Sequence, residues 1–181
     1  MVAMTNAKST GLGLEVQDDY NFDVRYDTAT DEAIFDVVIP DGTWFALMLG
    51  SDRMTRGSDI IIFEANGSSS DFHDATSNGY SSPKIDAADN LTGSFEQVGG
   101  EVKFTVRRPI DTDDFDNDYV IPLDTSFKCS YAINSRTNSI GSKHQSRYRK
   151  TLTLKSDGQP TFGPKTDDGS GAKDETETDK A

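Results

Sequence analysis

The chain has 181 residues, enough for one domain with a substantial hydrophobic core. Its 18 basic and 31 acidic residues give a formal net charge of −13, which argues against a general nucleic-acid-binding protein, because phosphate backbones are bound mainly by lysine and arginine. The same charge opposes docking on an anionic membrane surface, and no stretch approaches the roughly 18 consecutive apolar residues of a membrane-spanning helix. The charge serves solubility or reflects a salt-rich habitat, or else it forms an acidic face that meets a basic partner. A single cysteine, Cys129, excludes an internal disulfide bond and a thiolate metal cluster within one chain.

Apolar residues, 34% of the chain, are concentrated away from its two ends. The sequence therefore predicts three parts: a flexible N-terminal segment at 1–13, a folded domain at 14–160, and an acidic disordered tail or linker at 161–181. The N-terminal segment lacks the apolar core of a secretory signal peptide, so we expect such a signal to have been removed or never to have existed.

The folded part is predicted to be β throughout, because short apolar runs that alternate with polar residues recur between turn residues. The predicted strands, in chain order, are 20–26, 33–39, 43–49, 58–64, 101–107, 126–134 and 149–155. A Pro-Asp-Gly turn separates the second strand from the third, and a polar loop follows the third. The strand at 58–64 is apolar on both faces, which predicts a central strand that is covered on each side.

The later predicted strands each have one apolar face. Val102, Phe104 and Val106 alternate with polar residues, and Cys129 shares the inward face of 126–134. We therefore expect Cys129 to be a small buried core residue and not a nucleophile. No window has the pattern of a capped amphipathic helix, and no internal repeat is present. The sequence thus predicts an all-β sandwich or barrel.

Few residues are available for catalysis. Of the two histidines, His73 lies in a polar stretch that we expect to be exposed, and His144 lies in a loop before the last predicted strand. No His-x-x-x-His pair, Gly-x-Ser-x-Gly elbow or phosphate-binding loop occurs. With 31 acidic residues, adjacent carboxylates are expected by chance. The residues therefore indicate no organised acid–base site.

The acidic segment 111–118 (DTDDFDND) is a candidate calcium site, because hard cations prefer clustered oxygen ligands. It fails the EF-hand pattern, since it has no glycine at the turn position and no terminal glutamate at the right offset. We therefore rank a calcium-dependent adhesion domain third among the possible functions.

One soft, redox-capable pair of side chains remains, Met54 and His144. A thioether and an imidazole form an axial pair that is common in electron-transfer haems, in which no iron position is open to a substrate. Met54 is unusual in lying within a polar loop and not in a strand. From the residues alone, the ordinary interpretation, a core methionine and a solvent-exposed histidine, stays open.

Three segments resemble the signatures of the DOMON family. Residues 42–63 (GTWFALMLGSDRMTRGSDIIIF) are similar to its strand, methionine-bearing loop, small residue, Asp and apolar strand. Residues 106–118 resemble its arginine-rich strand end followed by Asp-Thr-x-Asp, and residues 131–154 combine Tyr-Ala-Ile-Asn, His144 and a basic run into the last strand. The resemblance covers roughly residues 15–157 in the right order. It is closest to the haem-b-binding branch, which includes the cytochrome domain of cellobiose dehydrogenase and plant auxin-induced apoplastic cytochromes.

The resemblance implies an immunoglobulin-like antiparallel β-sandwich that holds haem b without a covalent bond. In this sequence the axial iron ligands would be Met54 and His144, with Tyr80 as a further cofactor-binding residue. The basic residues that could bind the haem propionates are Lys143, Arg147, Arg149 and Lys150. Met48 is a rival ligand that strand alternation assigns to the core, and His73 is expected at the surface.

The function implied by the resemblance is electron transfer and not catalysis, within a chain that could be one domain of a larger oxidoreductase. Its partner would be a redox protein or a small reductant such as ascorbate, and its location extracellular or tethered to a membrane. The alternative is a haem-free DOMON module that binds carbohydrate or a protein partner. Trp44 and the tyrosines would then offer a stacking platform, although Trp44 also suits the core.

Overall fold

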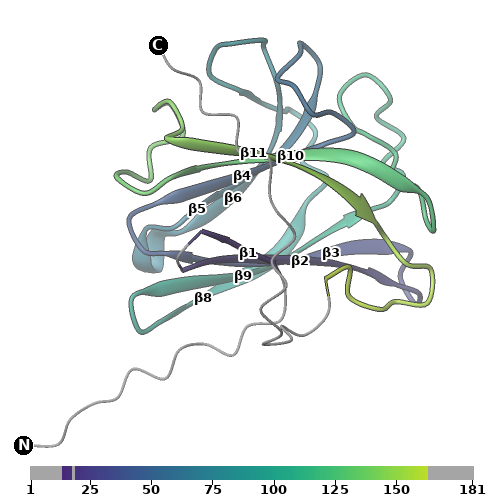
Figure 1. Ribbon diagram of the computed structural model, residues 1–181, viewed down its shortest axis with the longest axis horizontal. Helices are drawn as coiled ribbons and strands as arrows, with labels where there is room; N and C mark the ends of the chain where they lie inside the picture. The colour runs from purple at the N-terminus through teal and green to yellow at the C-terminus, as the bar shows by residue number, and fades with distance from the viewer. Residues whose placement is uncertain (1–13, 18, 163–181) are drawn as a thin grey trace, which may run out of the picture.

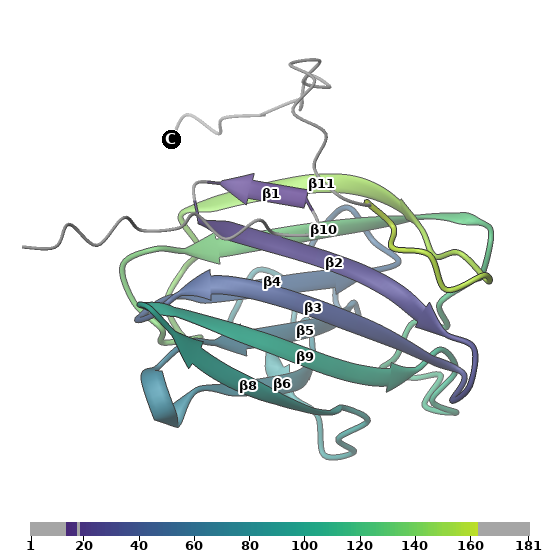
Figure 2. The same cartoon turned by 90° about the horizontal axis from the view of Figure 1, so that it is seen from below.

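The computed structural model describes residues 14–17 and 19–162 (Figure 1). The predicted N-terminal segment at 1–13 and the tail from 163 onward lie outside the described residues, so the domain boundaries stay a prediction. The described chain forms two antiparallel sheets packed face to face, which confirms the all-β sandwich (Figures 1 and 2). The one helical segment among the described residues is a 3-10 turn, η1 (Gly67–Ser69). None of the described residues belongs to a helix long and apolar enough to cross a membrane.

The first sheet has five strands in the order β1–β2–β3–β9–β8. Their bounds are Leu14–Gln17 (β1), Tyr20–Asp27 (β2), Glu32–Pro40 (β3), Glu101–Pro109 (β9) and Thr92–Val98 (β8). The second sheet has six strands in the order β11–β10–β4–β5–β6–β7. Their bounds are Ser146–Thr153 (β11), Ser126–Asn134 (β10), Trp44–Leu49 (β4), Asp59–Glu64 (β5), Asp71–Thr76 (β6) and Lys84–Ile85 (β7).

The main hydrophobic core lies between the two sheets, where alternate residues of each strand meet. In the first sheet Phe35 pairs with Val106 across β3 and β9, and both side chains are buried. Phe45 of β4 meets Phe63 of β5, with ring centroids 6.0 Å apart. Cys129 belongs to this core, as predicted, and its burial raises the pKa of the thiol to about 12.

A second, smaller apolar cluster lies on the outer face of the six-stranded sheet. It consists of Met48, Ile60, Ile62 and Ala75, with Met54 packed against it. The residues between these on the strands face the main core, so β4 and β5 are apolar on both faces. This confirms that the predicted strand at 58–64 is central and covered on each side.

Four strands are not predicted by the alternation pattern: β1, β6, β7 and β8. β6 includes His73, so the expectation of an exposed polar stretch there is wrong: Asp74, Ala75 and Thr76 are buried. β8 is an edge strand in which every residue is exposed, and an edge strand of this kind carries little hydrophobic signal. The last strand begins at Ser146 and not at 149.

Candidate functional site

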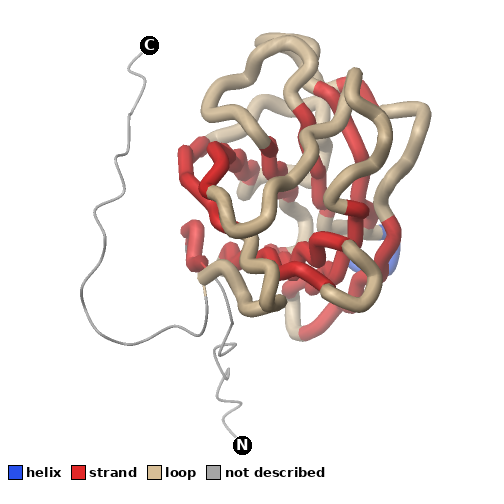
Figure 3. Tube along the Cα trace, turned by 90° about the vertical axis from the view of Figure 1, so that its right-hand side faces the viewer, coloured by secondary structure: helices blue, strands red, loops and turns tan. Residues whose placement is uncertain are grey.

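A cavity of about 570 Å³ lies over the second apolar cluster, on the outer face of the six-stranded sheet. Its floor is formed by apolar side chains of β4 and β5 and by Ile140 of a neighbouring loop. The floor residues of the two strands are Trp44, Ala46, Met48, Ile60 and Ile62. Three loops at 50–58, 77–83 and 135–145 supply its walls. Figure 3 shows that loops gather at the top of that view, beyond the layers of strands. An enclosed apolar floor with a polar rim, at this volume, is typical of a cofactor or ligand site.

The loop between β4 and β5 holds Met54 over the cavity floor. Hydrogen bonds fix the backbone on both sides of this residue: Ser51 Oγ donates to the Arg53 carbonyl at 2.7 Å, and the Ser58 amide donates to the Thr55 carbonyl at 3.2 Å. Met54 is half-buried and packs against the second apolar cluster. The thioether is therefore positioned at the cavity by a structured loop.

Gly50 forms the base of this loop and has a positive φ of 70°. A Cβ at this position would overlap the ring of Tyr119, which packs against the Gly50 backbone. Glycine is thus required here for two reasons, its left-handed conformation and its lack of a side chain. The close approach anchors the methionine loop to the segment that precedes β10.

His144 enters the cavity from the loop between β10 and β11. The residues on either side are tied to the end of β10: Asn134 Nδ2 donates to the Lys143 carbonyl at 3.0 Å, and the Gln145 amide donates to the Ile133 carbonyl at 2.9 Å. Burial, followed by the positive charges of Arg147 and Lys143, lowers the pKa of the imidazole. The neutral ring, which is the form that binds metals, is therefore favoured.

Basic side chains line the rim of the cavity although the whole chain is strongly acidic. They are Arg53, Lys143, Arg147 and Arg149. The Arg149 Nε donates to the Asp52 carbonyl at 3.1 Å, which ties β11 to the methionine loop. Of the four basic residues expected at the site, Lys150 does not line the cavity. Tyr80 does line it and is 89% exposed, so its ring lies at the mouth.

Trp44 and Met48 contribute to the floor of this cavity. Trp44 is only 6% exposed, so it does not form an open stacking platform. Its indole Nε1 is buried and has no hydrogen-bond partner in the described ranges 14–17 and 19–162. Met48 is buried, as predicted, but it belongs to the second cluster and not to the main core. The alternation along β4 places Trp44 and Met48 on the face of the sheet away from the main core, which Phe45 and Leu47 enter. The sequence alone does not show that loops cover this outer face.

His73 does not line the cavity. It lies half-buried on β6, and its Nε2 is 2.8 Å from Oε2 of Glu64 on the neighbouring strand β5. This histidine is therefore part of a cross-strand pair. The structure brings Met54, His144 and Tyr80 together around one cavity and leaves the other histidine outside it.

Comparisons with known proteins agree with the fold. Residues 17–134 match the DOMON domain family. The structure is similar to the cytochrome b domain of pyranose dehydrogenase from Coprinopsis cinerea, with a TM-score of 0.58, 20% identity and 74% of each chain covered. It is also similar to the cytochrome domain of cellobiose dehydrogenase from Myriococcum thermophilum, with a TM-score of 0.53, 14% identity, and 77% of this chain and 76% of that chain covered. No curated protein matches the sequence significantly.

Proposed function

The chain belongs to the DOMON domain family, and from that premise we propose that it is a b-type cytochrome domain that binds one haem b without covalent attachment. The observation that carries the proposal is that Met54 and His144, from loops far apart in the sequence, line the same apolar-floored cavity. Both structural relatives described above are cytochrome domains.

The residues around the cavity fit this group. The floor is apolar, as a porphyrin ring requires, and the buried indole Nε1 of Trp44 is a donor without a partner among the described residues. The rim carries Arg53, Lys143 and Arg147, and guanidinium and ammonium groups bind carboxylates such as propionates strongly. Tyr80 at the mouth offers a phenol to a propionate that reaches the solvent.

Met54 and His144 would be the axial ligands, so no iron position would stay open to a substrate. When bound, the haem supplies one-electron chemistry, and axial methionine raises its reduction potential. The hydrogen bonds on both sides of His144 hold its backbone in place, and the apolar floor would exclude water from the cavity. The proposed role is therefore electron carriage and not catalysis by this domain alone.

The partner follows from the same proposal. A cavity whose mouth lies at the exposed Tyr80 suits electron exchange with a redox protein or with a small reductant such as ascorbate. The related structures are, by their names, domains of dehydrogenases, which supports a place beside a redox enzyme. We propose an extracellular or membrane-tethered location, on kinship alone.

The test is an absorption spectrum of the full chain after reconstitution with haem, first oxidised and then reduced with dithionite. We expect uptake of one haem per chain and the sharp visible bands of six-coordinate, low-spin iron on reduction. Met54→Leu and His144→Ala should each abolish the low-spin spectrum, while the circular dichroism of the sandwich is retained.

Two control variants are matched to the ligands. Met48→Leu removes the other thioether at the cavity, and His73→Ala removes the histidine outside it, so both should keep the low-spin spectrum. A low-spin spectrum in the Met54 or His144 variant would overturn the ligand assignment. Absence of stoichiometric haem uptake by the wild-type chain would overturn the cytochrome proposal and favour a haem-free module that binds carbohydrate or protein.

A further inference from the structure

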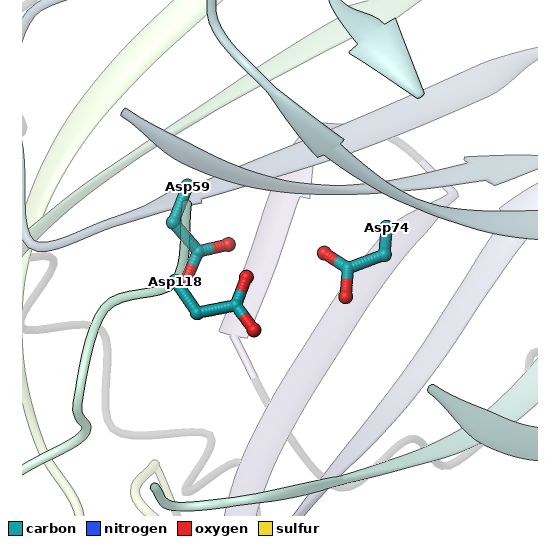
Figure 4. Close-up of side chains that lie close together, drawn as sticks. All are labelled: Asp59, Asp74 and Asp118. Carbon is teal, nitrogen blue, oxygen red and sulfur yellow. The ribbon is translucent and has the colours of Figure 1, made fainter. Parts of the chain in front are cut away.

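Three carboxylates from separate parts of the chain meet between the two sheets at one end of the sandwich. Asp59 begins β5, Asp74 lies on β6, and Asp118 belongs to the loop between β9 and β10. One oxygen from each lies within 4.8 Å of the others. Figure 4 shows the carboxylates of Asp74 and Asp118 facing each other, with that of Asp59 beside them.

Two of these carboxylates are almost completely buried and incompletely hydrogen-bonded. Asp59 is 3% exposed and Asp74 is 2% exposed, and the Oδ1 atom of each has no hydrogen-bond partner within the part of the chain that the structure describes. The strand pairing explains their direction: Asp74 lies opposite Ile61, a core residue, so its side chain points into the sandwich. A buried carboxylate oxygen without a partner is costly, which indicates that a ligand completes this group.

One oxygen of each carboxylate is held in place by hydrogen bonds. The Asp59 Oδ2 atom accepts hydrogen bonds from Arg108 Nη1 at 2.5 Å and from the Tyr119 amide at 2.9 Å. Asn90 bridges the other two acids, since its amide donates to Asp74 at 3.3 Å and its Nδ2 donates to Asp118 at 2.8 Å. The three carboxylates are therefore oriented before any ligand binds.

The negative charges of this cluster are not balanced by basic side chains among the described residues. Three carboxylates surround this point, and Arg108 is the basic side chain that is hydrogen-bonded to one of them. One divalent cation would bring the group to neutrality.

A cleft of about 300 Å³ leads from the surface to two of these carboxylates. It is lined by both Asp59 and Asp118, together with Asp116 and Asn117 from the acidic segment 111–118. An ion therefore has a polar route into the cluster. Other carboxylates of that segment are used within the loop, as when Asp114 accepts a hydrogen bond from Asn117 Nδ2, so the segment is not an EF-hand-like site by itself.

We propose that Asp59, Asp74 and Asp118 bind one calcium ion at the end of the sandwich. All the donors are oxygen atoms, which excludes a preference for zinc, whose usual ligands are nitrogen and sulfur. Magnesium binds through few carboxylates and retains several waters in a strict octahedron, whereas calcium accepts clustered carboxylates in flexible geometry. The site lies on the inner face of the six-stranded sheet, separate from the cavity on its outer face, and does not depend on haem binding.

The test uses the full chain, treated with EDTA and then freed of the chelator. Titration calorimetry with calcium chloride should show one ion bound per chain. Calcium at 100 times its Kd should raise the Tm by about 5–10 °C, because a ligand that binds only the folded state stabilises it by mass action. Magnesium chloride at the same concentration should have a clearly smaller effect.

Asp74→Asn is the informative variant, because it removes one negative ligand and should not prevent folding in the absence of metal. We expect its calcium affinity to fall by about tenfold or more. Asp113→Asn makes the same charge change at an exposed position of the acidic loop and should bind calcium like the wild type.

Three results would overturn the proposal. The first is the absence of saturable calcium binding by the wild-type chain. The second is calcium binding that Asp74→Asn leaves unchanged, which would indicate attraction to the acidic surface in general. The third, an equal response to magnesium, would overturn the assignment to calcium.

Discussion

Arg108 and Asp59 form a buried ion pair that joins the two sheets: Arg108 Nη1 donates to Asp59 Oδ2 at 2.5 Å. Arg108 is 0% exposed, and its Nη2 also donates to the Tyr119 carbonyl at 2.7 Å. The pair thus fixes three segments at the end of the sandwich, β9, β5 and the loop before β10. Burial raises the pKa of Asp59, and Arg108 opposes this rise.

Arg108→Met should destabilise the protein strongly, because it leaves Asp59 buried without its cation beside two other acids. Removal of one partner of a buried pair costs about 3–5 kcal/mol. Urea unfolding of the full chain measures the change in the free energy of unfolding. Arg107→Met is the matched control, since Arg107 is half-exposed and pairs with Asp27 and Glu32 at the surface. An equal decrease in the free energy of unfolding of the two variants would show that the buried ion pair contributes no more to stability than the surface pair.

The raised pKa of Asp74 should make the protein less stable as pH rises toward 7 in the presence of EDTA. Its pKa of about 7 in the folded state lies above the value of about 3.9 expected in the unfolded state, so the folded chain holds a proton that the unfolded chain has lost. The free energy of unfolding should therefore fall as pH rises from about 4 to about 7, by at most about 1.4 kcal/mol per pH unit from this group. The charged groups that surround it are Asp59, Asp118 and Arg108.

Asp74→Asn should remove this contribution, so the variant should gain stability relative to the wild type as pH rises to 7. Urea unfolding at several pH values measures the difference between the two proteins. Curves that stay parallel across this range would contradict the assigned pKa.

Gly50→Ala should destabilise the protein by about 2–4 kcal/mol, because the new methyl group adds an overlap with Tyr119 to the strain of a left-handed residue. Gly57→Ala is the control within the same loop: its φ is also positive, at 79°, but a Cβ there meets nothing within 4 Å. Thermal unfolding should show a clearly smaller loss for the control. Similar losses would mean that backbone strain alone accounts for the effect.

Trp44→Phe should weaken haem binding without unfolding the domain, if the proposed function holds. The change keeps an aromatic ring on the cavity floor and removes the unpartnered Nε1 donor. Loss of the one hydrogen bond that this donor would make to the haem corresponds to about 0.5–1.5 kcal/mol, or roughly 2–12-fold in affinity. Haem titration followed by absorption measures it, and the low-spin spectrum should persist at saturation. An unchanged affinity would exclude a role for this donor.

Much of the fold could be predicted from the sequence, because seven strands show the alternation that a two-layer sandwich requires. The strand β8 escaped this reasoning because all its residues are exposed, so neither face carries an apolar signal. The strand β6 could not be predicted because its buried residues include Asp74 and Thr76, whose polar side chains are typical of an exposed loop. In both cases tertiary pairing overrides local composition.

The candidate site shows a different limit. The family resemblance, and not spacing alone, selected Met54 and His144, and nothing in the sequence places their two loops over one cavity. The sequence indicates a candidate calcium site at 111–118, which includes Asp118, but not the contribution of Asp59 and Asp74, although a signal for a buried acidic partner exists. Arg108 continues the inward parity of Val102, Phe104 and Val106 in β9, and a buried arginine demands an acidic partner. The identity of that partner, Asp59, depends on packing between sheets.

The alternation of β5 and β6 has a consequence for how the chain tolerates insertions and deletions. Asp59 and Asp74 face the interior, while their immediate neighbours Ile60 and Ala75 form part of the small apolar cluster on the opposite side. A slip of one residue in either strand exchanges the two sides. It would present a carboxylate to the hydrophobic surface and an alkyl group to the carboxylates. A single residue added to or lost from either strand of this hairpin would therefore disrupt both the carboxylate cluster and the apolar cluster. The two clusters independently constrain the length of the hairpin.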